Sequence, residues 1–235
     1  VDVGTNSSSY LLVAGDVGST VRVVVTASNG AGSQGATSAQ TGVVAAASTS
    51  TVTTVSFSVA ASGDDGYAFS KGAAYPPAAA PDANTTGPTV TMARRLTPNG
   101  YDVYAGLLRF DTSAIPDDAT VTGVTFRAQV MGKVSADGRN LVGEWYDPAG
   151  WPIDAGDYAL NSSATALAAM SIAQIVAGAQ NDFPLAAPAS LSKTGLSALR
   201  LFVDGGQPTG DNYVQFASYD HATLTEPQLV VTYTR

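Results

Sequence analysis

The chain of 235 residues contains no cysteine and a single histidine, His221. Without thiols it has no disulfide framework, no thiol nucleophile and no thiolate metal site. One imidazole with neither cysteine nor a second histidine does not build a typical zinc site. No GxSxG elbow supplies the nucleophile of a Ser-His-Asp triad. We therefore predict that His221, in "SYDHATLTEPQL", faces solvent or braces a turn and has no part in catalysis.

Charge is also scarce. Only 13% of the residues are charged, about half the usual share, and the net charge is −8. The few Lys and Arg residues are scattered, with Arg94-Arg95 the densest pair, whereas nucleic acids and anionic membranes attract clustered cations. Long apolar runs are missing too, because "ATALAAMSIAQIVAGA" is too short to span a bilayer. The composition predicts no nucleic-acid partner and no membrane insertion.

Carboxylates do not form an obvious catalytic pair. Glycoside hydrolysis needs two facing carboxyl groups, but Asp64-Asp65 and Asp117-Asp118 are neighbours in sequence whose side chains normally point apart. Aspartate at such positions favours turns. We predict that the chain is not an enzyme.

The first 45 residues have the pattern of a β-meander. Val21, Val23 and Val25 alternate with their neighbours as in a strand with one better-buried face. "SNGAGS" suits a hairpin turn, and residues 37–44 are predicted to form the partner strand. This stretch resembles the last strands of a bacterial immunoglobulin-like repeat. Such a sandwich has about seven strands, and about three are present. We predict that residues 1–46 are the C-terminal part of an immunoglobulin-like domain, completed by preceding chain or by another chain, and that residues 47–51 form a linker.

From residue 52 onward, turn clusters such as "SGDDG" and "DGGQPTGD" separate short β-rich runs at residues 103–110, 119–130, 140–146, 198–203, 212–217 and 228–234. Many short strands with regular turns are typical of an all-β sandwich or jelly roll. One short helix is predicted in "SIAQIVAG", where Ser171 can cap the start and Gly178 the end. "SATALAAM" just before it is predicted to add a helical turn.

Three segments of this region carry a family resemblance: "GLLRFDTSAIPDDATVTGVTFRAQV", "LRLFVDGG" and "YVQFASYDHATLTEPQLVVTY". Residues 52–235 resemble the DNRLRE-type modules, which are related to the disaggregatase-type carbohydrate-binding modules. The resemblance implies a jelly-roll-like β-sandwich that belongs to extracellular or cell-surface proteins. The central "LVGEWYDPAGWPIDAGDYAL" replaces a tryptophan-rich run of that family. This variant, together with "GGQPTGDNYVQFASYDHATLTEPQL", resembles versions in tail and fibre proteins of phages that infect actinobacteria.

These observations lead to an expected function. We expect a non-catalytic structural or adhesion module of a phage virion appendage, a minor tail or fibre protein at the virion surface. It would contact host-surface glycans and assemble with other copies or other subunits. The alternative is a carbohydrate-binding module of a secreted bacterial polysaccharide-degrading enzyme or of a surface adhesin, because fold does not decide function.

Aromatic residues are the candidate ligand contacts, since a flat ring can stack on a sugar while polar neighbours bond its hydroxyls. Trp151 lies in the Pro/Gly/Asp-rich loop "PAGWPID", and Tyr146 and Tyr158 flank that loop. Trp145 lies in the strand run before it and is predicted to be buried.

No cofactor is predicted except calcium. Oxygen-rich loops offer the carboxylates and carbonyls that calcium prefers, although none has EF-hand spacing. The candidate ligands are Asp147, Asp154 and Asp157, or Asp64 and Asp65.

The strand "LLRFD" allows one prediction about strand orientation. Because side chains alternate between the two faces of a strand, Leu108 and Phe110 are expected in the core. Arg109 is then expected on the outer face or rim, paired with a carboxylate.

Overall fold

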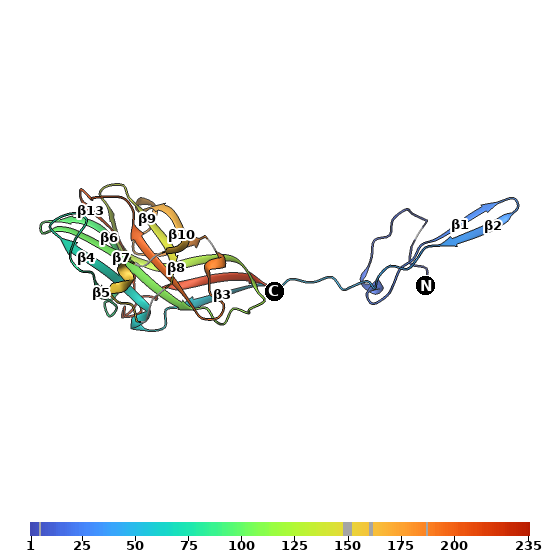
Figure 1. Cartoon of the computed structure of the whole chain (residues 1–235), viewed down its shortest axis with the longest axis horizontal. Helices are drawn as coiled ribbons and strands as arrows, with labels where there is room; N and C mark the ends of the chain where they lie inside the picture. The colour runs from blue at the N-terminus through green and yellow to red at the C-terminus, as the bar shows by residue number, and fades with distance from the viewer. Residues whose placement is uncertain (5, 148–151, 160–161, 187) are drawn as a thin grey trace. The chain divides into compact units, whose positions relative to one another are not determined.

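The computed structural model describes residues 1–235 except residues 5, 148–151, 160–161 and 187. The chain divides into two compact units, Val1–Ser50 and Thr51–Arg235, which Figure 1 draws from blue to red along the sequence. Its regular structure is β strand with short 3-10 turns. No helix in the described residues is long and apolar enough to cross a membrane.

The first unit is a two-stranded ribbon with a short turn. It contains η1 (Ala14–Asp16), β1 (Val24–Asn29) and β2 (Gly32–Thr37), and the two strands pair around the predicted hairpin turn. Backbone bonds continue the ribbon: the Thr41 N–H donates to the Val21 carbonyl at 2.8 Å and the Val44 N–H to the Ser19 carbonyl at 2.8 Å. Among the residues described in this unit, only Asp16 is buried. These described residues form no apolar core of their own.

The second unit is a β-sandwich, as predicted. All its strand pairs are antiparallel. Its elements are β3 (Val52–Ser58), η2 (Ser62–Asp64), β4 (Asp65–Gly72), β5 (Asp82–Asn84), β6 (Thr89–Thr97), β7 (Gly100–Asp111), β8 (Thr120–Ser135), β9 (Asn140–Tyr146), η3 (Ala155–Ala159), β10 (Ser162–Ser171), η4 (Ile172–Gln174), β11 (Gln180–Leu185), η5 (Pro188–Ser190), β12 (Leu196–Val203), β13 (Asp211–Ala217) and β14 (Gln228–Thr234).

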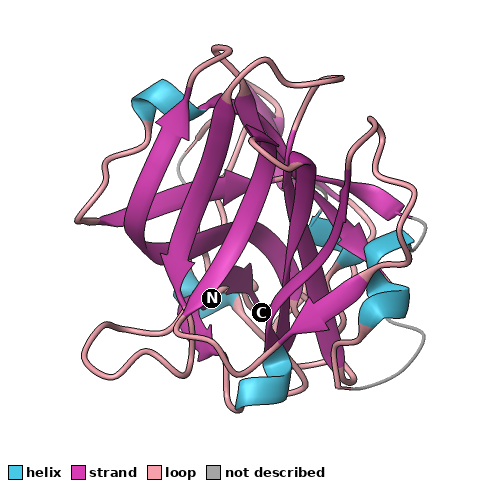
Figure 2. Ribbon diagram, turned by 90° about the vertical axis from the view of Figure 1, so that its left-hand side faces the viewer, coloured by secondary structure: helices cyan, strands magenta, loops and turns pink. Residues whose placement is uncertain are grey.

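Two curled layers face each other in this unit (Figure 2). The strands form one continuous twelve-stranded sheet in the order β10-β9-β12-β7-β6-β13-β8-β14-β3, with β4 pairing β5 and β7 and with β11 pairing β8. The sheet curls on itself, so that the part from β10 to β7 forms one layer and the part from β6 to β3 forms the other. Strand β7 belongs to both layers, because residues 100–104 pair with β6 and residues 105–111 pair with β12. Strands β6 and β12 therefore pair with successive parts of β7 and diverge where these two parts meet. We call this place the fork.

The main core lies between the layers. Leu108 and Phe110 of β7 are 0% exposed, and they pack in one cluster with Phe126 of β8 and Phe216 of β13. The Phe126 ring centroid lies 6.5 Å from that of Phe110 and 5.4 Å from that of Phe216. Trp145 is also buried, and its indole N–H donates to the Ala186 carbonyl at 2.9 Å. The predicted burial of these strand faces is confirmed.

The predicted position of Arg109 is also confirmed. It lies on the face of β7 opposite Phe110, and its Nε donates to Asp64 Oδ1 at 2.9 Å. The outer face is not simply solvent-exposed, however. Leu107 lies there in a second, smaller buried cluster, which is covered by Ile153 from the loop before η3.

The predicted helical segment is wrong. Residues 172–174 form a single 3-10 turn, η4, and Ile175 is already extended with φ −69° and ψ 140°. The stretch "SATALAAM" is strand β10, which pairs with β9 through three register shifts. Alanine and leucine are good helix formers, but helix propensities are small in energy, and pairing with a neighbouring strand outweighs them here. The chain there has no short helix beyond this turn.

Candidate binding site

The outer face of the first layer brings two of the predicted aromatic residues together. Tyr146 ends β9 and Tyr158 belongs to η3, and both pack on the small cluster around Leu107 and Ala198. Tyr146 is only 4% exposed, so it has no ring face to offer a ligand, and the desolvation of its hydroxyl raises its pKa. Tyr158 is half-buried. Of the two, only Tyr158 is placed to touch a ligand directly.

A pocket of about 240 Å³ opens at the fork, where β6 and β12 part from β7. Aromatic rings and guanidinium groups line it beside small aliphatic side chains. The lining residues are Arg94, Val103, Tyr104, Ala105, Tyr158, Arg200, Phe202 and Val203. Sequence analysis identified only Tyr158 among them. Arg200 and Phe202 could have been found, because they alternate with buried Leu199, Leu201 and Val203 along β12.

Arg200 is fixed in place by its partners. Its guanidinium pairs with Glu144 on the neighbouring strand β9, and the two side chains are 14% and 15% exposed. Its Nη1 also donates to the Tyr158 carbonyl at 3.3 Å. Arg200 thereby connects β9, β12 and η3, and it holds Tyr158 over the sheet.

Arg94 spans the fork itself. Its Nε donates to the Val203 carbonyl at the end of β12 at 2.6 Å, and its Nη1 donates to the Tyr75 hydroxyl. Burial raises the pKa of the Tyr158 hydroxyl, and the positive charges of Arg94 and Arg200 oppose that rise. Both arginines line the pocket together with Tyr158.

A row of rings continues from the pocket onto β4. Tyr104, which lines the pocket, stacks on Phe69 with centroids 5.3 Å apart and planes at 20°, and its centroid lies 5.4 Å from that of Tyr67. The Lys71 ammonium lies 5.0 Å from the Phe69 centroid. All three rings are partly exposed. The row offers flat apolar surface beside a hydrogen-bond donor.

The aspartates considered for calcium mostly serve the backbone. Asp157 is buried, and its Oδ2 accepts the Asp154 N–H at 2.9 Å. Asp154 Oδ1 accepts the Gly156 N–H. Asp147 is exposed at the end of β9. These bonds are those of turn-building carboxylates.

The second group of candidate calcium ligands is divided between two partners. Asp64 pairs with Arg109, whereas Asp65 Oδ2 accepts the Tyr219 N–H at 2.8 Å. In the part of the chain that the structure describes, no three His, Cys, Asp or Glu side chains gather into a group that could hold a metal ion. Calcium stays an untested prediction.

The single histidine has a structural role, as the sequence predicted. His221 is partly exposed, and its Nδ1 accepts the N–H groups of Thr223 at 3.3 Å and Leu224 at 3.1 Å. It braces the turn that leads toward β14. Trp151 lies outside the described residues.

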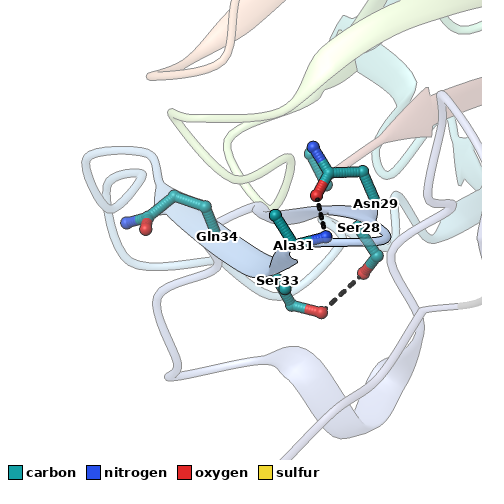
Figure 3. A pocket seen from close by; sticks show the side chains of 7 residues that line it. Ser28, Asn29, Ala31, Ser33 and Gln34 are labelled. Carbon is teal, nitrogen blue, oxygen red and sulfur yellow. Dashed lines mark hydrogen bonds between the residues drawn. The ribbon is translucent and has the colours of Figure 1, made fainter.

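A larger hollow of about 330 Å³ lies on the hairpin of the first unit. Figure 3 shows its polar lining, in which Asn29 accepts the Ala31 N–H at 2.9 Å and the Ser28 and Ser33 hydroxyls are 2.7 Å apart. Its lining residues include no aromatic ring and no ionisable side chain. The pocket at the fork has the more specific chemistry of the two.

Comparisons with known proteins add little detail. The sequence matches no protein-family model and no curated protein sequence. Among solved structures, one described as a carbohydrate-binding module from the β-sandwich superfamily, with promiscuous specificity, is 14% identical, with a TM-score of 0.25. The match covers 90% of this chain and 71% of that chain. A similarity at this level says nothing about the ligand of the present chain.

Proposed function

We propose that the second unit is a non-catalytic carbohydrate-binding module and that the pocket at the fork is its binding site. One observation carries the proposal: a pocket on the sandwich surface combines the rings of Tyr158, Phe202 and Tyr104 with guanidinium donors that hydrogen bonds hold in place. Pockets for drug-sized ligands measure about 300–1,000 Å³. A volume of about 240 Å³ therefore suits a single sugar ring. Neighbouring sugar units of a longer ligand would lie on the row of aromatic side chains beside Tyr104.

The chemistry of the lining supports binding without catalysis. Glycosidases place two carboxyl groups on either side of the scissile bond, whereas the described residues that line this pocket include no carboxylate. Glu144, just behind the pocket, is paired with Arg200. A sugar bound at the fork would meet donors and apolar ring faces but no general acid or base.

The wider setting that we propose is an extracellular appendage at a virion surface, in which the module contacts host glycans. The resemblance of residues 52–235 to DNRLRE-type modules, in a variant that resembles those of phage tail and fibre proteins, supports it, as does the upstream ribbon. Val23, Val24 and Val25 of that ribbon are 59–61% exposed, and this apolar surface suits contact with other copies or subunits. Adsorption of the purified chain to actinobacterial cells, competed by their soluble surface glycans, tests this setting.

Calorimetric titration with a panel of neutral and acidic oligosaccharides tests the binding site. We expect saturable binding that Tyr158→Ala and Phe202→Ala each weaken by about tenfold or more, because each removes ring surface from the pocket. Tyr219→Ala is the matched control, since that tyrosine is 45% exposed and lies outside the pocket lining. Binding that both pocket variants retain in full, with their fold intact, would place the site elsewhere.

A further inference from the structure

Arg94 differs from the other arginines of the second unit. Each of the others has an acidic partner within 4.0 Å: Arg95 with Asp211, Arg109 with Asp64, Arg127 with Asp182, Arg139 with Asp137, Arg200 with Glu144 and Arg235 with Asp118. Among the described residues Arg94 has none. Acidic residues are not scarce, because the chain has 19 of them against 11 Lys and Arg. The guanidinium of Arg94 therefore lacks a counter-charge at a place where the chain could have supplied one.

The guanidinium of Arg94 is held in a fixed orientation. Its Nε and Nη1 are occupied by the Val203 carbonyl and the Tyr75 hydroxyl. The two N–H groups of Nη2 have no partner among the described residues. The side chain is partly buried, and a buried charge without a counter-ion is unfavourable. The arrangement is that of a donor group prepared for an anion that binds from outside.

The surroundings of Arg94 concentrate positive charge in the pocket. Arg200 lies in the same lining, and its charge is compensated by Glu144. The lining contributes no carboxylate of its own. One positive charge thus remains uncompensated beside aromatic rings of suitable size for a sugar. A neutral sugar would leave that charge unmatched.

We propose that the pocket selects sugars that carry a carboxylate, namely uronic acids, and that Arg94 binds the carboxylate through Nη2 and the remaining N–H of Nη1. This inference rests on the proposed carbohydrate-binding function. A planar guanidinium edge matches a planar carboxylate in a two-point contact, while the rings of Tyr158 and Phe202 contact the sugar ring. Tyr75 and Val203 act as positioning groups that aim the guanidinium.

The test compares matched ligands. Oligosaccharides of glucuronic, galacturonic and mannuronic acid are titrated by calorimetry against the wild-type chain, each beside its carboxyl-reduced neutral counterpart and beside a sulfated neutral oligosaccharide. We expect at least one uronic-acid ligand to bind about tenfold to hundredfold tighter than its reduced counterpart, the range of a charge-assisted hydrogen bond. The preference should shrink as salt rises, because an exposed ion pair is screened.

Two substitutions assign the preference to one residue. Arg94→Gln should abolish the difference between acidic and reduced ligands, with a larger loss of affinity for the acidic ligand than for the reduced one. Arg94→Lys, which keeps the charge but not the planar edge, should leave an intermediate preference. Arg95→Gln is the matched control, because the next residue along β6 points to the opposite face and is paired with Asp211. It should leave the preference unchanged.

The outcomes separate this inference from the function on which it rests. Equal affinity of the wild type for acidic and reduced ligands overturns the inference and leaves carbohydrate binding standing. A stronger preference for the sulfated ligand overturns the assignment to a carboxylate. Failure of the folded wild type to bind any ligand of the panel overturns both proposals. Because the first comparison uses the wild type alone, it decides the matter even where Arg94→Gln does not fold.

Discussion

Asp65 is a carboxylate inside the protein that has no cationic partner among the residues that the structure describes. It is 0% exposed at the start of β4, and its Oδ1 has no hydrogen-bond partner among the described residues. Burial raises its pKa to about 7, opposed by the hydrogen bond from the Tyr219 N–H and assisted by the negative charges of Asp220 and Asp64. Asp220 has a buried oxygen without a described partner as well. The carboxyl group of Asp65 is thus held protonated over much of the acid range.

This pKa makes stability depend on pH in a definite direction. An unfolded aspartate titrates near 4, so the native state binds the proton of Asp65 more tightly. Its contribution is fully present below about pH 4 and is lost as pH rises through about 7. Asp65→Asn stays neutral and keeps an oxygen for the Tyr219 N–H. The variant should be more stable than the wild type at pH 8, on the order of 1–4 kcal/mol, with little gain at pH 4.

Urea unfolding at pH 4, 6 and 8 measures this difference. Asp117→Asn is the control, because Asp117 is exposed, and it should follow the wild-type curve. If the unfolding free energy of Asp65→Asn declines with rising pH as that of the wild type does, the group that holds the proton is not Asp65.

For single residues, the sequence predicted which face of a strand a side chain occupies but not which distant segments contact it. Alternation along "LLRFD" correctly placed Phe110 in the core and Arg109 opposite it, because neighbouring strand residues point to opposite faces. It did not predict that Leu107 on the outer face is buried, since Ile153, which covers it, comes from a distant loop. Arg94 was noted in the sequence only as half of a basic pair. The role that we propose for it depends on the Val203 carbonyl, more than a hundred residues away.

At the scale of elements, the pairing of β4 with β5 depends on one glycine. Gly66 has φ +151°, and a Cβ there would collide with the Asn84 carbonyl oxygen and lie 2.9 Å from the Thr85 Cα, both backbone atoms that cannot move aside easily. Gly66→Ala should therefore cost about 2–4 kcal/mol of unfolding free energy. Thermal or urea unfolding measures it.

Gly132 in β8 is the control for that substitution. A Cβ there meets only the Tyr213 and Gln215 side chains, at 3.7 and 3.8 Å, which is ordinary contact. Gly132→Ala should change stability by less than about 0.5 kcal/mol or increase it slightly. Similar losses in the two variants would show that the close approach of β5 is not what requires glycine.

Strands could be predicted from the sequence where apolar and polar residues alternate, and could not be predicted where they do not. The runs that became β9, β13 and β14 keep one buried face throughout. Strand β10 pairs through three register shifts, so its apolar positions lose the spacing of two and resemble a helix. Strand β6 was missed because residues 90–93 are buried on both faces, which removes the alternation altogether.

At the scale of the whole molecule, the two units have different sources of stability. The second has a large core between its layers, whereas the described part of the first buries only Asp16, which accepts the Tyr10 hydroxyl at 2.9 Å. A lone two-stranded hairpin is marginal in water. We expect residues 51–235 to unfold cooperatively at the same temperature with or without residues 1–50, and the isolated peptide 1–50 to show no cooperative transition. The immunoglobulin-like assignment of residues 1–46 stays a prediction.

Calorimetry of the two fragments and of the full chain tests this difference, with hydrogen exchange to report on β1 and β2. Slow exchange of their amides in the isolated peptide would show that the ribbon is stable by itself.

The two ends of the sandwich lie side by side. The Thr51 N–H donates to the Arg235 carbonyl at 2.8 Å, the Arg235 N–H donates to the Thr51 carbonyl at 3.1 Å, and β3 and β14 continue that ladder in antiparallel register. Tension applied at residues 51 and 235 would therefore break the hydrogen bonds between β3 and β14 one pair at a time. It would not load all of these bonds at once, as a shearing force would. The module would yield at low force from that end, whereas the fork is built from other strands, β6, β7 and β12.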